Sequence, residues 1–138
     1  LVDGTIDAIA TDHAPHSVLE KDVPFEEAKN GIVGLQTALP LALALYHAGT
    51  LAPLTLIERL TVGPARALGL ATPRLAVGER ADVTIVDPDR RWRWQASDVA
   101  SKSHNSPFFG REMQGKARIV IVAGRVVHRD SRVAATSR

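Results

Sequence analysis

The spacing of apolar residues predicts one main helix in the first half of the chain. Between residues 31 and 48, apolar side chains recur at helical intervals, and Gly49 is a suitable residue to end the helix. Both faces of this stretch are apolar, so we expect the helix to be wedged between two layers. Pro40 lies inside it and is expected to kink the helix or mark a break near its first turns.

Shorter elements surround this helix. Two short helices are expected, at residues 54–60 and 63–70. The first follows Pro53, and the second has Pro64 near its start. Residues 6–11 form a mostly apolar run typical of a buried parallel strand. The polar, acidic stretch 16–30 predicts a long loop with one helical turn at residues 25–28, and loops of this length are usually functional.

The period becomes two from residue 73 onward, which predicts strands. Residues 82–87 read as one strand, and residues 118–123 and 125–128 as a hairpin around Ala123-Gly124. Trp92 and Trp94 are two residues apart, so they should share one face of a further strand, as core or surface cover. We expect residues 97–115 to be rich in loops and the tail from Asp130 to be frayed.

The order of these elements indicates one βα unit followed by part of a small β domain. The strand of a single βα unit has no parallel neighbour within this chain to pair with. We therefore expect the 138 residues to be a part of a longer protein rather than one whole domain.

Composition limits the classes of protein that need to be considered. Hydrophobic residues make up 45% and charged residues 23%, which is typical of a folded globular chain. Cysteine is absent, which excludes disulfides and thiolate zinc sites. We recognise no signal peptide or membrane-spanning stretch and expect a soluble, cytoplasmic protein with no membrane partner.

The charge is unevenly distributed. Residues 1–90 hold 7 Lys and Arg against 12 Asp and Glu, a net charge of −5, whereas residues 91–138 hold 10 against 3, a net charge of +7. Only Arg90, Arg91 and Arg93 cluster tightly, so we interpret the basic part as a solvated surface and expect no nucleic-acid binding.

Polar residues with catalytic potential follow the first expected strand. Asp12 comes directly after residues 6–11, with His13 and His16 beside it. Active sites of α/β folds assemble at the carboxyl ends of strands, so Asp12 is a candidate metal ligand or general base. From this local pattern alone, hydrogen-bonded turn formation explains the residues as well.

Longer strings around these residues resemble a known family. The strings in the first half resemble the C-terminal part of dihydroorotases of the bacterial type I kind, within the amidohydrolase superfamily. They are residues 10–16 (ATDHAPH), 20–21 (EK) and 30–41 (NGIVGLQTALPL). The strings in the second half follow in the family's order and resemble its later motifs. They are residues 63–70 (GPARALGL, with Gly63 where asparagine is usual), 77–83 (VGERADV) and 103–108 (SHNSPF).

The resemblance implies a fold and an activity. Residues 1–70 would be the C-terminal edge of a metal-dependent α/β fold, the (β/α)8 TIM barrel, and residues 71–138 part of a small β-sandwich domain. The implied enzyme is a cyclic amide hydrolase with a small-molecule substrate. Its reaction would be the reversible cyclisation of N-carbamoyl-L-aspartate to L-dihydroorotate, in de novo pyrimidine (UMP) biosynthesis.

The resemblance also assigns roles to particular residues. Asp12 would be the catalytic aspartate that ligates zinc and carries a proton, and His16 would hold the free carboxylate of the substrate. Asn30 and Gly31 would contact the substrate through their backbone. The complete enzyme would hold two Zn²⁺ ions, with the other ligands upstream of this chain, so we expect the isolated chain to be inactive.

Several alternatives stay open. His13 either orients Asp12 or only packs, and His47, His104 and His128 are expected to be structural or exposed. A hydantoinase or allantoinase is an alternative enzyme, although these relatives usually have another residue where His16 stands. A third reading is a non-catalytic dihydroorotase-like subunit, assembling with aspartate transcarbamoylase. A homo-oligomer is the other assembly that the resemblance suggests.

Overall fold

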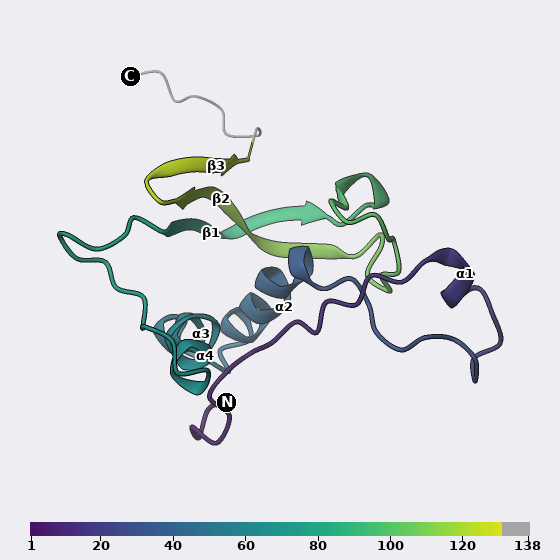
Figure 1. Cartoon of the computed structure of the whole chain (residues 1–138), viewed down its shortest axis with the longest axis horizontal. Helices are drawn as coiled ribbons and strands as arrows, with labels where there is room; N and C mark the ends of the chain where they lie inside the picture. Colours follow the sequence, from purple (N-terminus) through teal and green to yellow (C-terminus); the bar gives the residue numbers. More distant parts are fainter. Residues whose placement is uncertain (131–138) are drawn as a thin grey trace.

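Helices lie on one side of the molecule and a small antiparallel sheet on the other (Figure 1). The computed structural model describes residues 1–130. The helices in chain order are α1 (Val18–Lys21), α2 (Leu35–His47), α3 (Pro53–Leu60) and α4 (Val62–Ala67). The strands are β1 (Val83–Arg93), β2 (Glu112–Val122) and β3 (Arg125–Arg129), and the 3-10 turn η1 (Ala96–Asp98) follows β1.

Helix α2 lies between the sheet and the other helices, as its two apolar faces predict. It contacts β2 on one side and α3 on the other. Pro40 is inside the helix, which continues through it, and Gly49 follows the helix end with a φ of +70°. One cluster of the core consists of Ala42, Leu43, Leu51 and Leu56, and the last is fully buried.

The expected strand at residues 6–11 is the main local correction. This segment is extended but is not a strand among the described residues, because it has no strand to pair with. The Ile9 N–H donates to the Arg59 carbonyl at 2.9 Å, and a single parallel bridge joins His13 to Ile32. The segment therefore passes from the α3 and α4 region along α2 without becoming part of a sheet (Figure 1).

The expected hairpin is confirmed. Strands β1 and β2 are both longer than the strands expected from the sequence. The strand order is β1-β2-β3, and Ala123 and Gly124 have φ of 48° and 78°, as a two-residue hairpin turn requires. The pairing of β1 skips from Asp87 to Arg91, which places Pro88 in a bulge where its missing N–H costs no ladder bond. Trp92 is thus in the same strand as residues 83–87 and not in a separate one.

Strand β2 corrects a second expectation. It begins at Glu112, so the last part of the expected loop 97–115 is paired with β1. The rings of Trp92 and Trp94 meet edge to face at 5.7 Å, and Trp94 is 1% exposed, which agrees with a core role. Asp130 is buried and its N–H donates to the Arg118 carbonyl at 2.8 Å. The tail expected to be frayed otherwise lies outside the described residues.

The loop 16–30 contains one helix that the apolar pattern did not predict. The expected turn near residue 25 is present, with the Ala28 N–H bonded to the Pro24 carbonyl at 3.0 Å. Helix α1 precedes it, and Ser17 and Glu20 at its start have the spacing of a capping box. Within residues 1–130, no helix is both long and apolar enough to cross a membrane.

Candidate functional site

Asp12 stands at the point where the extended segment turns into the loop. Its side chain is exposed, and its backbone has a φ of 43°, in the left-handed region. Aspartate is one of the few residues other than glycine that adopts this conformation regularly. The turn therefore ends the extended run at Asp12 and leaves its carboxylate accessible to a ligand.

His13 caps a helix. Its Nδ1 accepts hydrogen bonds from the backbone N–H of Gly34 at 3.0 Å and of Leu35 at 3.5 Å, at the start of α2. A ring nitrogen that accepts carries no proton, so the proton of the neutral imidazole is on Nε2. Of the two roles expected for His13, an orienting bond to Asp12 is not among the hydrogen bonds of residues 1–130.

The structure brings two of the sequence-predicted segments together. The Ala14 N–H donates to the Ile32 carbonyl at 2.9 Å, which holds the loop after Asp12 against the segment that contains Gly31. Gly31 has a φ of +102°, and a Cβ there would overlap the Ala14 Cβ and lie 3.9 Å from the Nε2 of His16. Gly31 is thus required both by its conformation and by the close approach of the other segment.

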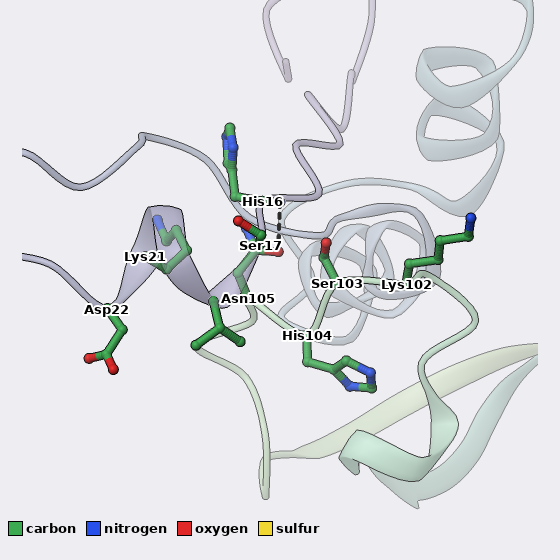
Figure 2. A pocket seen from close by; sticks show the side chains of 9 residues that line it. His16, Ser17, Lys21, Asp22, Lys102, Ser103, His104 and Asn105 are labelled. Atoms are coloured by element: carbon green, nitrogen blue, oxygen red, sulfur yellow. Dashed lines mark hydrogen bonds between the residues drawn. The ribbon is translucent and has the colours of Figure 1, made fainter.

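A cavity of about 540 Å³ opens beside His16 (Figure 2). Its walls come from the start of α1 and from the loop between β1 and β2, two regions far apart in the sequence. The lining residues are His16, Ser17, Val18, Lys21, Asp22, Lys102, Ser103, His104 and Asn105. Asp12, Asn30 and Gly31 do not line this cavity, so His16 is the one expected site residue that faces it.

The charges around the cavity are mostly basic. Lys21 and Lys102 line it together with His16 and His104, against one carboxylate, that of Asp22. Such a surface attracts an anionic ligand. A second acidic residue, Glu20, does not line the cavity but lies 3.9 Å from the Nδ1 of His16 and can pair with that ring when it is protonated.

Glu20 has a perturbed pKa. The backbone N–H of Ser17 donates to its Oε2 at 2.9 Å, and the Ser17 hydroxyl donates to the same oxygen at 2.8 Å. These bonds, the backbone one first, favour the charged carboxylate and lower the pKa of Glu20 from its usual 4.5. The carboxylate in turn fixes the start of α1 next to His16.

Asn105 and Lys21 are residues of the site that were not assigned from the sequence. The Asn105 side chain contacts Ala14, His16 and Gly31, and the Lys21 ammonium donates to the carbonyls of Lys29 and Gly31. No periodic pattern signals such contacts. Both residues do lie in strings that carry the family resemblance, and that was the available signal.

The described residues do not by themselves form a metal site. No group of three or more His, Asp or Glu side chains that could hold a metal ion occurs within residues 1–130. Zinc sites in proteins use at least three protein ligands. Asp12 is therefore at most one ligand of the expected metal centre.

Known proteins match nearly the whole of this chain. The dihydroorotase of Geotalea daltonii is 56% identical over 129 residues, which are 94% of this chain and 30% of that protein. The dihydroorotase of Pelobacter propionicus is 54% identical over the same shares of both chains. This chain thus spans about 30% of the length of the curated relatives that it matches.

A solved structure agrees with the family resemblance. The L-hydantoinase (dihydropyrimidinase) from Arthrobacter aurescens superposes with a TM-score of 0.83 at 33% identity, over 92% of this chain and 30% of that one. The expected fold class, the C-terminal part of an amidohydrolase barrel followed by part of a small β domain, is confirmed. A model described as "Amidohydrolase family" matches residues 1–127, and the chain therefore belongs to the amidohydrolase family.

Proposed function

We propose that this chain is the part of a dihydroorotase that contributes the proton-carrying aspartate and the contacts to the substrate carboxylate. The reaction is the reversible cyclisation of N-carbamoyl-L-aspartate to L-dihydroorotate, a step of pyrimidine biosynthesis. The observation that carries the proposal is the 56% identity to a dihydroorotase over 94% of this chain.

Asp12 is proposed to move the proton. In the ring-opening direction a water oxygen attacks the amide carbonyl carbon, and the ring C–N bond breaks. The Asp12 carboxylate takes a proton from the attacking oxygen and gives it to the leaving nitrogen. Its exposed position at the end of the extended segment supports this role.

His16, Asn30 and Gly31 are proposed to bind the substrate. A protonated His16 ring offers two N–H donors to the free carboxylate of the substrate. The Gly31 carbonyl already accepts from Lys21 and Asn105, so the N–H is the group of this residue that is left for a ligand. The basic surface of the adjoining cavity supports an anionic substrate.

Zinc is proposed as the cofactor of the complete enzyme, with Asp12 as one ligand. Because residues 1–130 contain too few ligands for a zinc site, no catalytic step is assigned to the metal here.

We also propose the division of the chain at residues 70 and 71. Residues 71–82 are exposed throughout and contain no helix or strand, as expected of a connection between two parts. The parts meet through α2 and β2 and through side-chain hydrogen bonds of Gln36 and Asn105.

A hydantoinase activity is the second candidate, because the Arthrobacter hydantoinase superposes at 33% identity. Hydantoin has no ring carboxylate, so it offers no partner for His16. The higher identity to dihydroorotases favours the first candidate.

The deciding experiment compares substrates on the complete enzyme that contains this chain. We expect ring opening of dihydroorotate and no ring opening of hydantoin or allantoin. The reaction is monitored by the loss of absorbance of the cyclic amide. Turnover of hydantoin without turnover of dihydroorotate would replace the first candidate by the second. Inactivity towards every cyclic amide would support a non-catalytic subunit.

A further inference from the structure

Asn105, which lines the cavity with His16 (Figure 2), connects the β part of the chain to both segments of the proposed site. Its Nδ2 donates to the Ala14 carbonyl at 2.8 Å and to the Gly31 carbonyl at 3.2 Å, and its Oδ1 accepts from the His16 N–H at 3.3 Å. We propose that Asn105 is the positioning residue that holds His16 and Gly31 at the spacing needed to bind the substrate carboxylate. This inference rests on the proposed function.

The side-chain amide suits these three contacts for a chemical reason. It has two N–H donors and one carbonyl oxygen, and all of them are used. A carboxylate of the same shape can accept from His16 but cannot donate to the carbonyls of Ala14 and Gly31. An alanine makes none of the three bonds.

The loop that carries Asn105 is itself firmly held. The ring N–H of the buried Trp94 donates to the Ser106 hydroxyl at 3.2 Å, and its carbonyl accepts from the Gly110 N–H at 2.8 Å. The Asn105 carbonyl accepts from the Val33 N–H at 3.1 Å, just before α2. Asn105 therefore transmits the position of a rigid part of the protein to the loop after Asp12.

The two ends of this bridge differ in how much they depend on Asn105. The Gly31 carbonyl has a second donor in the Lys21 ammonium, at 3.3 Å. The His16 N–H is bonded to Asn105 alone among the hydrogen bonds of residues 1–130. Loss of the amide should thus displace His16 more than Gly31.

Gln36 provides a matched control elsewhere between the same two parts of the chain. Its side-chain amide donates to the Asp98 carbonyl at 2.7 Å and accepts from the Ala100 N–H at 2.7 Å. Gln36→Ala therefore removes an amide bridge of the same kind but leaves His16 and Gly31 untouched.

The test measures kcat and KM of the complete enzyme with dihydroorotate. For Asn105→Ala we expect KM to rise about tenfold, which corresponds to a loss of about 1.4 kcal/mol of binding free energy, and kcat to stay within about threefold. Asn105→Asp, which keeps the shape, should raise KM at least as much. Gln36→Ala should leave KM unchanged.

A double-mutant cycle separates positioning from general stability. In a His16→Ala background, Asn105→Ala should raise KM much less than in the wild type, because it acts mainly through His16 and the Gly31 carbonyl keeps its bond from Lys21. An additive rise of KM in that background, or an equal rise for Gln36→Ala, would overturn the proposal.

A measurement without substrate distinguishes a failure of this inference from a failure of the proposed function. Hydrogen exchange of the His16 amide should become faster in Asn105→Ala, which has no acceptor for it, and stay unchanged in Gln36→Ala. An unchanged exchange rate in Asn105→Ala would overturn the positioning role. A wild-type enzyme that does not turn over dihydroorotate would instead overturn the proposed function.

Discussion

At the scale of single residues, two side-chain amides join the helical and β parts of the chain. They are expected to differ in their effect on substrate binding. Gln36 bridges to the stretch around η1, whereas Asn105 reaches across 91 residues to the Ala14 carbonyl. Both contacts use the ability of an amide to donate and accept at once. Only the second touches the segments proposed to bind substrate, so chemically equal residues are expected to differ in their effect on binding.

Asp12 carries the first prediction at this scale. Asp12→Asn keeps the size of the side chain but removes its ability to take a proton. We expect kcat of the complete enzyme to fall about a thousandfold at saturating dihydroorotate, within the range typical of general acid–base catalysis. Steady-state kinetics measure this, and near-normal turnover would contradict the assigned mechanism.

The second prediction at this scale concerns the pKa of Glu20. Since the Ser17 bonds lower the pKa of Glu20 below 4.5, the stabilisation of the α1 start is fully present above pH 4.5. It is lost as the pH falls through the lowered pKa, because protonation then weakens these bonds. An NMR titration of the Glu20 carboxyl carbon should give a midpoint below 4.5.

Ser17→Ala is the control for this titration. It removes the hydroxyl donor and keeps the backbone N–H, so the midpoint should move only part of the way up. A wild-type midpoint at or above 4.5 would show that the pair does not form.

At the scale of elements, α3 separates buried from exposed apolar residues within one helix. Leu56 is 0% exposed in the core, whereas Leu54 is 83% exposed. We expect Leu56→Ala to lower the free energy of unfolding by about 2–5 kcal/mol, through lost burial and a residual cavity. Leu54→Ala should change it by less than about 0.5 kcal/mol.

Urea denaturation of the chain, monitored by the fluorescence of its two tryptophans, compares the two variants. Equal losses of stability would mean that α3 does not pack through Leu56.

Elements with a complete local pattern were predictable from the sequence. Helix α2 and the hairpin at Ala123-Gly124 were correct because periodicity and turn residues lie within each segment. Strand pairing was less predictable, because it depends on partners. Residues 6–11 have no such partner, and β1 continues past Pro88 only because β2 accommodates a bulge there.

The candidate site was predictable to a similar degree. Asp12 and His16 stand out as polar residues after an apolar run, and the family resemblance singles out Gly31. The contacts of Asn105 could not be derived, because they join residues that only the folded chain brings together. Helix α1 was missed although Ser17 and Glu20 carry its capping signal.

At the scale of the whole molecule, the chain contributes too few ligands for a metal centre. We expect the 138-residue chain to show no saturable binding of micromolar Zn²⁺ by isothermal titration calorimetry, and no turnover of dihydroorotate. If the complete enzyme supplies the further ligands proposed above, it should bind the ion tightly.

Two results would contradict this prediction. One is stoichiometric zinc binding by the chain that Asp12→Ala abolishes. The other is dihydroorotate hydrolysis by the purified chain.

The reach of Asn105 has a consequence for the order of events during synthesis. The loop around Ala14 leaves the ribosome long before residue 105, and contacts between such distant residues form late in folding. A nascent chain that ends before Asn105 contains Asp12, His16 and Gly31 without the amide that joins them. These three residues are thus made before Asn105 but are expected to reach their final arrangement only after it has been made.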